Sequence, residues 1–227
     1  MLDGPATNAL AHQITNLLFL ASPERNRLAT PAWVRAELYA AGPVESHDTA
    51  AIEIGTAEGP TACFIASHCS EESFGPVIEI EAERGHVVWQ MGQGATITYA
   101  DGTRESCREE HDRDRETMVA NFAEAIRAND ASLLRCSLAA TRPFVLALDG
   151  AHESSRRVHR IPASCSHRVD EGTDQARTVV DGLDALLVRA AQERKLLGDL
   201  AEAPAWTVRT QPFDLRGYSH FPQRFAL

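Results

Sequence analysis

The first twenty residues carry apolar and polar side chains at the spacing of an amphipathic helix. At about 100° per residue, the segment 6–21 separates them onto two faces. The apolar face contains Leu10, Ile14, Leu17, Leu18 and Ala21. The polar face contains Asn8, His12, Thr15 and Asn16. Amides, an imidazole and a hydroxyl without any charge are typical of the wall of a polar pocket. The pattern therefore predicts a helix with a core face and a candidate binding face.

From residue 33 to residue 99, many apolar positions recur at every second residue, which is the period of a half-buried strand. Six strands are expected, over the ranges 33–40, 48–56, 61–68, 77–83, 86–90 and 95–99. Most are bounded by short turns that contain glycine, so neighbouring strands should pair antiparallel. The alternation implies a sheet with one face on the core and the other on water or a partner.

The helical period returns after residue 114. Helices are expected over 115–129, 133–158 and 174–197, with Pro143 kinking or splitting the second, and the charged run 105–114 is expected to be a loop. Segregated strands and helices predict the α+β class, with an open, mainly antiparallel sheet of about six or more strands and helices packed on one face. The domain is expected to span 1–202, and an aromatic-rich tail, 203–227, should pack on it.

The composition narrows the classes of function. With 44% hydrophobic residues in 227, the chain can bury the core of one large domain. The net charge of −10 argues against nucleic-acid binding, which needs a concentrated basic surface. No apolar run approaches a membrane span and no signal peptide is evident, so we expect a cytoplasmic protein that does not bind membranes. The five cysteines include no CxxC pair and are expected to be reduced thiols.

Several kinds of site have no motif in the sequence. No phosphate-binding loop of the GxGxxG or GxxxxGK[ST] type occurs, and the glycines Gly92 and Gly94 lie between strands, where a hairpin turn is expected. No GxSxG nucleophile elbow is present. His47-Asp48 and His68-Cys69 contain metal-ligand residue types without the spacing of a known metal site. We therefore expect structural roles for these residues and no metal.

The strongest local candidate for chemistry is the pair Asn8 and His12. At positions i and i+4 they should be neighbours on the helix, where an amide can orient an imidazole for proton transfer. Thr15 and Asn16 would extend the same polar wall and contact a substrate. The alternative is a surface helix that carries an ordinary histidine.

Taken in order, several segments resemble the C-terminal domain of the Gfo/Idh/MocA family of sugar and inositol dehydrogenases. Residues 8–20 are similar to that family's DxGxHxxD helix and the apolar run that follows it. Residues 34–38, 47–54, 121–127 and 143–162 add support, and the resemblance covers nearly all of 5–165. It implies a domain that shapes a substrate pocket, forms oligomer contacts through its open sheet, and works with a Rossmann domain that binds NAD or NADP.

The sequence departs from the family pattern at several positions. The aspartates of the motif fall on Asn8 and Thr15 and its glycine falls on Leu10, whereas His12 matches. The family's catalytic lysine belongs to an EKP motif of the Rossmann domain, which is not found in this sequence, and Lys195 cannot be its counterpart. An asparagine can hold an imidazole by a hydrogen bond, but it cannot stabilise an imidazolium through charge.

Two functions are favoured on this basis over a third, a hydrolase or other independent enzyme. In the first, the chain is the substrate-binding and oligomerisation half of an NAD(P)-dependent oxidoreductase for a sugar, inositol or related polyol, and it binds no cofactor alone. His12 would then act as the acid/base group or hydrogen-bond donor, with Asn8 orienting it. A Rossmann-domain partner and a homo-oligomer through the open face of the sheet are expected. In the second, the chain is a stand-alone carbohydrate-binding or assembly module without redox activity.

Overall fold

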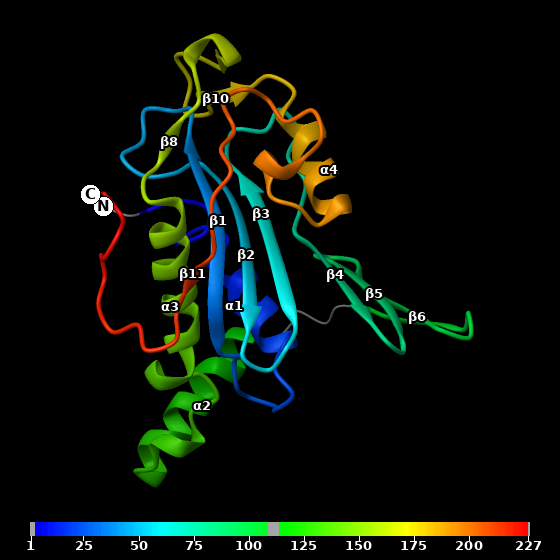
Figure 1. The fold of residues 1–227 in the computed structure, drawn as a ribbon. Helices are drawn as coiled ribbons and strands as arrows, with labels where there is room; N and C mark the ends of the chain where they lie inside the picture. The colour runs from blue at the N-terminus through cyan, green and yellow to red at the C-terminus, as the bar shows by residue number, and fades with distance from the viewer. Residues whose placement is uncertain (1–2, 109–113, 227) are drawn as a thin grey trace. The chain divides into compact units, whose positions relative to one another are not determined.

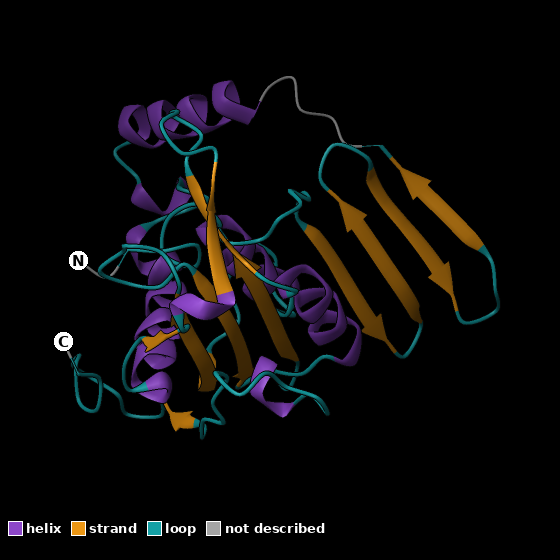
Figure 2. Ribbon diagram, turned by 90° about the horizontal axis from the view of Figure 1, so that it is seen from above, coloured by secondary structure: helices purple, strands orange, loops and turns teal. Residues whose placement is uncertain are grey.

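The computed structural model describes residues 3–108 and 114–226, and the chain divides into two compact units. Met1–Glu72 and Leu138–Leu227 make up the first unit, and Ser73–Ser137 makes up the second. Helices and mostly antiparallel strands are segregated along the chain, so the predicted α+β class is confirmed (Figure 1, Figure 2). The six expected strands are all present as β1 to β6, but they are divided between two sheets.

The sheet of the first unit is built on an antiparallel meander of β1, β2 and β3. Its strands are β1 (Pro31–Ala40), β2 (Thr49–Thr56), β3 (Thr61–Ser67), β8 (His159–Arg160) and β11 (Phe213–Asp214). The register places Val34 opposite Ile54, and it places Ile52 opposite Phe64. On its other edge, β1 pairs antiparallel with β11 and parallel with β8, so segments from the end of the chain complete the sheet.

Helices cover both faces of this sheet. They are α1 (Ala11–Leu20), α3 (Leu138–Ser155) and α4 (Leu183–Glu193). α1 and α3 pack on the face that carries Val34 and Ile52, and each large aliphatic side chain buried there contributes roughly 1.5–3 kcal/mol. α4 packs on the opposite face around Tyr39 and Ala51. The sequence predicted helices on one face only. The second face also carries apolar side chains, which must be buried, and α4 buries them.

The end of α3 is fastened directly to the edge of β1. The Ser154 hydroxyl accepts a hydrogen bond from the Ala36 amide at 2.9 Å, and the Ser155 hydroxyl accepts one from the Leu38 amide at 3.1 Å. Both amides lie between the positions of β1 that pair with β11 and with β8. Buried backbone donors need such partners, so the two serines replace the missing neighbouring strand.

The second unit contains a four-stranded antiparallel sheet in sequence order and one long helix. The elements are β4 (Val77–Ala82), β5 (Gly85–Gln90), β6 (Gly94–Tyr99), β7 (Arg104–Cys107), α2 (Asp114–Ala128) and the short 3-10 helix η1 (Ala131–Leu133). Gly92 and Gly94 join β5 to β6 with φ of 79° and 97°, so the expected hairpin turn is confirmed. β7 replaces part of the loop expected over 105–114, and residues 109–113 lie outside the described residues.

Two of the helices expected after residue 114 differ from the structure. The helix expected over 133–158 begins only at Leu138, and Pro143 lies inside α3 without dividing it. The first part of the helix expected over 174–197 is wrong, because β10 (Arg177–Val180) pairs with β9 (Ser166–Val169) there. Gly182, with φ of 71°, then separates β10 from α4. Within the described residues, no helix is long and apolar enough to cross a membrane.

Candidate functional site

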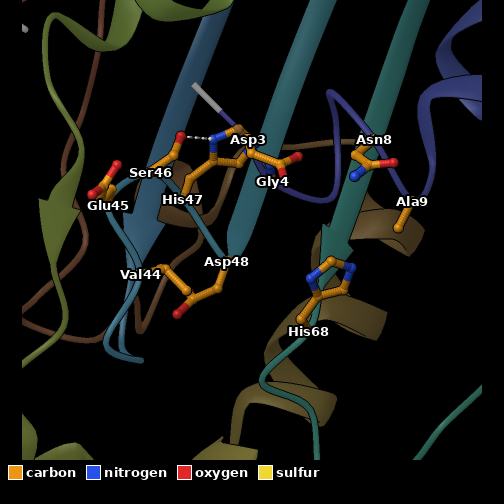
Figure 3. Close-up of a pocket in the computed structure, with 10 residues that line it drawn as sticks. All are labelled: Asp3, Gly4, Asn8, Ala9, Val44, Glu45, Ser46, His47, Asp48 and His68. Atoms are coloured by element: carbon orange, nitrogen blue, oxygen red, sulfur yellow. Dashed lines mark hydrogen bonds between the residues drawn. The ribbon is translucent and has the colours of Figure 1, made fainter. Parts of the chain in front are cut away.

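A surface pocket of about 350 Å³ lies where the start of the chain meets the β1–β2 loop and the end of β3 (Figure 3). Its lining consists of Asp3, Gly4, Asn8, Ala9, Val44, Glu45, Ser46, His47, Asp48 and His68. All of these residues belong to the first unit. The concentration of imidazole, amide, hydroxyl and carboxylate groups makes this pocket the best candidate for a binding site.

Asp48 holds the β1–β2 loop in shape. One oxygen of its carboxylate accepts hydrogen bonds from the Ala41 amide at 2.9 Å and the Gly42 amide at 2.7 Å. Its backbone amide donates to the Tyr39 carbonyl, and its own carbonyl accepts from the His68 amide. A carboxylate that receives two backbone amides within one turn fixes that turn, so Asp48 places the neighbouring side chains at the pocket.

His47 forms the buried part of the lining. It is 2% exposed, its Nδ1 lies 3.1 Å from the Ser46 hydroxyl, and its Nε2 has no hydrogen-bond partner among the described residues. Burial, followed by the neighbouring imidazoles of His152 and His68, lowers the pKa of His47 to about 3. The imidazole is therefore neutral at physiological pH and can exchange hydrogen bonds but not carry charge.

The C-terminal tail packs behind His47. The rings of His47 and His152 meet edge to face with centroids 5.7 Å apart, and Phe225 meets His152 in the same way at 4.9 Å. Burial lowers the pKa of His152, whose Nδ1 donates to the Leu148 carbonyl at 2.8 Å. The rings of His47, His152 and Phe225 thus form a continuous series of contacts from the β1–β2 loop to the C-terminal tail.

The structure separates the four residues that the sequence suggested for the site. Asn8 lines the pocket and is exposed. His12 and Asn16 are exposed on α1 and do not line it. Thr15 is half-buried, and its hydroxyl donates to the Ala11 carbonyl within the helix. Asn8 is thus the one member of the set at the pocket, whereas His12 and Asn16 face solvent.

The reason for this separation is the late start of α1. The expected helix over 6–21 begins only at Ala11, because the segment before it forms turns. The Leu10 amide bonds to the Pro5 carbonyl, five residues back, which breaks the α-helical register. The side chains of Asn8 and His12 therefore lose the i, i+4 relation, and no hydrogen bond joins them in the described structure.

Sequence reasoning missed His47 and His68 as pocket residues. Both were interpreted as structural, and for His47 the burial supports a structural part as well. The available signal was the polar run of Ser46, His47 and Asp48 between two apolar strands. Within the described chain, no group of three or more histidine, cysteine, aspartate or glutamate residues could hold a metal ion. All five cysteines are unpaired.

No known protein-family profile matches the chain, and no curated protein matches it in sequence. Solved structures do match its fold, and two of them are a dehydrogenase and a putative oxidoreductase. UDP-N-acetylglucosamine 3-dehydrogenase GnnA from Acidithiobacillus ferrooxidans matches with a TM-score of 0.51 and 18% identity, over 66% of this chain and 49% of that one.

A putative NADPH-dependent oxidoreductase from Desulfitobacterium hafniense matches with a TM-score of 0.55 and 16% identity, over 66% of this chain and 45% of that one. The chain thus spans about half the length of these enzymes. At such identities, the likeness establishes a shared fold and no more.

The described residues do not fit a nicotinamide dinucleotide. Such a cofactor is held by a glycine-rich turn that joins a parallel strand to a helix. β10 does lead into α4 through Gly182, but β10 pairs antiparallel with β9 and its turn has one glycine. The pocket lining includes three residues with carboxylate side chains and no lysine or arginine, which does not suit a pyrophosphate.

Proposed function

We propose that the chain is the substrate-binding and oligomerisation half of an NAD(P)-dependent oxidoreductase that acts on a sugar, inositol or related polyol. The observation that carries this proposal is the polar surface of the first unit, where a pocket rimmed by Asn8 adjoins the start of a helix with exposed His12 and Asn16. The fold shared with oxidoreductases supports it. NAD or NADP would be held by a Rossmann domain on another polypeptide segment.

In this proposal each polar residue has a distinct part. His12 is solvent-exposed, so its imidazole is free to act as acid/base group or hydrogen-bond donor toward a substrate hydroxyl. Asn8 binds at the rim of the pocket and orients the substrate or the imidazole, and Thr15 and Asn16 extend the polar wall. Because Asn8 is uncharged, it would not stabilise an imidazolium.

The oligomerisation part of the proposal rests on the second unit. Val77 on β4 is 50% exposed, and every position of β5 is only half-buried. A sheet whose faces remain partly exposed in one chain can dock against a second copy. Sedimentation of the purified chain checks this part, because a monomer at all concentrations would contradict it.

A stand-alone carbohydrate-binding or assembly module is the alternative. Asn8 in place of an aspartate favours it. So does the position of Lys195, which is ion-paired with Glu193 at 2.9 Å and lies outside the pocket lining. The two functions differ in whether a nucleotide-binding partner turns polyol binding into redox activity.

Two titrations and one variant test the proposal. The chain should bind no NADH alone, whereas myo-inositol or glucose should raise its stability, by about 2.7 kcal/mol at one hundred times Kd. Tight NADH binding by this chain alone would refute the two-part arrangement.

In the enzyme reconstituted with its nucleotide-binding partner, His12→Ala should lower turnover at least about 100-fold. The matched His220→Ala, at an exposed histidine of the tail, should have no effect. Unchanged turnover in His12→Ala would remove His12 from the reaction.

A further inference from the structure

α2 carries a row of apolar side chains that no other part of the described structure covers. At about 100° per residue, Met118, Val119, Phe122 and Ile126 fall within an arc of about 100° on one side of the helix. Each is between 58% and 67% exposed, and Ala125 is the only residue of α2 that is buried in the described structure. A single exposed apolar side chain is ordinary, but a continuous row on a helix is typical of an interface. We call these four residues the α2 stripe.

The segment that follows α2 packs beside the stripe and leaves it open. The Asn121 side chain holds this segment, because its amide nitrogen donates to the Leu133 carbonyl at 2.8 Å and its oxygen accepts from the Arg135 amide at 3.1 Å. Asn121 lies about 100° around the helix from Phe122, on the same side as Ala125. η1 therefore occupies that flank of α2, and the stripe beside it needs a partner from elsewhere.

The stripe is symmetric about its centre. Met118 and Ile126 stand four residues before and four residues after Phe122. In an antiparallel pair of α2 helices with a two-fold axis at Phe122, the two Phe122 side chains meet, and Met118 of each copy meets Ile126 of the other. A two-fold interface between identical chains requires such a self-complementary surface, so the occupant that fits the stripe is a second copy of it.

Charged groups at the two ends of the stripe favour the same arrangement. Arg115 lies on the face of the stripe, seven residues before Phe122, and Asp130 follows the end of α2, eight residues after Phe122; both are exposed. Oδ1 of Asp130 accepts from the amide and the hydroxyl of Ser132, which lowers the pKa of Asp130 and keeps the carboxylate charged at neutral pH. Antiparallel pairing brings Arg115 of each copy to Asp130 of the other, whereas parallel pairing would bring the two Arg115 side chains together.

We propose that the α2 stripe is a homodimer interface, in which two copies of this chain pair their α2 helices antiparallel about Phe122. This contact uses a different surface from the sheet association proposed above and does not depend on it. Two helices of about four turns form a smaller interface than a standard stable complex, so the dimer should be weak and depend on concentration.

The first test is disulfide crosslinking at the two-fold axis. In a chain with Cys107→Ser and Cys136→Ser, which removes the two exposed cysteines, Phe122→Cys places one thiol on the stripe. Packed helices bring facing Cα atoms within disulfide range, so with oxidised glutathione this variant should form the crosslinked dimer at least about 10-fold faster than the matched Glu124→Cys, on the opposite side of α2. Equal rates for the two variants would overturn the proposal.

The second test asks whether the helices run antiparallel. Adding Arg115→Gln to the Phe122→Cys chain removes the attraction to Asp130 of the second copy, so crosslinking should slow by about 3-fold at low ionic strength. The matched Arg127→Gln, at an exposed position away from the stripe, should leave the rate unchanged. Faster crosslinking in Arg115→Gln would show that the two arginines repel each other in a parallel pair, which contradicts the proposed arrangement.

Sedimentation of chains without engineered cysteines separates this inference from the sheet association. Because the stripe joins two copies, Phe122→Asp should halve the molar mass found for the parent, whether or not the sheets also associate. Val188→Asp, at an exposed apolar side chain of α4, should leave the mass unchanged. A parent that is monomeric at all concentrations overturns both associations. An associated parent whose mass Phe122→Asp does not change leaves the sheet association standing and overturns the α2 dimer.

Discussion

Glu153 at the end of α3 and Glu37 in the middle of β1 are both fully buried, yet their surroundings treat the negative charge in opposite ways. Around Glu153, the donors come from the C-terminal tail. They are the amides of Gln223 at 2.5 Å, Arg224 at 2.5 Å and Phe225 at 3.0 Å, and the Tyr218 hydroxyl at 2.8 Å. Burial alone would raise the pKa of Glu153, but these hydrogen bonds outweigh it and lower the pKa.

Glu37 has fewer donors. Its carboxylate accepts from one backbone amide, that of Gly198, at 3.0 and 3.2 Å, and from the Tyr39 hydroxyl at 2.8 Å. Burial raises the pKa of Glu37 to about 7, and the nearby carboxylate of Asp199 adds to the rise. Arg35 does not cancel this effect, because it is ion-paired with Glu53 and Asp199.

The comparison shows that burial does not by itself decide whether a carboxylate is charged. Each glutamate binds a segment without regular secondary structure to the first unit. Glu153 accepts hydrogen bonds from the C-terminal tail, and Glu37 accepts them from the segment that begins at Gly198. Three amides and a hydroxyl keep the Glu153 carboxylate ionised at neutral pH. One amide and a hydroxyl leave the Glu37 carboxyl close to the midpoint of its titration at neutral pH.

The largest effect is expected from Glu153→Gln. The glutamine has one acceptor oxygen and two amide hydrogens in place of a carboxylate, so some of the three tail amides lose their partners. We expect a loss of about 4 kcal/mol of unfolding free energy at pH 7, measured by urea denaturation. Hydrogen exchange should become faster in the tail residues 218–226 first.

The exposed Glu171→Gln is the matched control and should change stability by less than about 0.5 kcal/mol. Because the folded pKa of Glu153 is lowered, its contribution is complete above its ordinary value near 4.5 and is lost as the pH falls through the folded value. A tail that exchanges no faster in Glu153→Gln would show that the aromatic contacts hold it instead.

Much of the sheet could be predicted because its strands are defined by local alternation. Val34, Ala36 and Leu38 in β1 are buried against α1 and α3, as the period of two requires. The same logic failed at 174–197. Val179 and Leu183 stand four apart and satisfy a helical period, but Val179 belongs to a strand and Gly182 separates the two. Spacing alone cannot distinguish such a coincidence from a continuous helix.

The pocket could be predicted only in part. Asn8 was identified from its place in an apparent helix, whereas its actual position depends on the turns that begin at Gly4 and Pro5. His47 reaches the pocket because β1 and β2 pair and Asp48 closes their loop. These are contacts between distant segments, which leave no periodic trace in the sequence.

A smaller, pH-dependent effect is expected from Glu37→Gln. Because the folded pKa of Glu37 is raised from 4.5 to about 7, its contribution to stability is complete below pH 4.5 and is lost as the pH rises through 7. The loss amounts to about 3 kcal/mol. Relative to the parent, the variant should therefore gain about 3 kcal/mol between pH 4 and pH 7 and little more between pH 7 and pH 8, because most of the loss is complete once the folded pKa is reached.

The measurement is the difference between urea denaturation free energies of parent and variant from pH 4 to pH 8. His47 contributes the opposite slope, since its folded pKa is lowered to about 3 and its stability contribution falls as the pH drops below 6.5. This term is present in both proteins and cancels in the difference. A difference that does not change with pH would mean that folding leaves the pKa of Glu37 unchanged.

The smallest and sharpest comparison uses the two tyrosines, each of which donates one hydroxyl hydrogen bond to one glutamate. Tyr218→Phe leaves Glu153 with three amides, so the pKa of Glu153 should rise but stay below its ordinary value, at a cost of about 1 kcal/mol. Tyr39→Phe leaves Glu37 with Gly198 alone, so the pKa of Glu37 should rise above 7.

Tyr39→Phe should also cost more, about 2 kcal/mol, because the Tyr39 hydroxyl accepts from the Val208 amide as well. Carbon-13 NMR titration of the two glutamate carboxyl groups reports both pKa values in the same sample. If the two substitutions changed the pKa of Glu153 and the pKa of Glu37 by the same amount, and changed stability by the same amount, the number of backbone donors would not be what distinguishes the two glutamates. If the pKa of Glu153 stays below its ordinary value and the pKa of Glu37 stays above it, the backbone amides are sufficient to determine which carboxylate is charged.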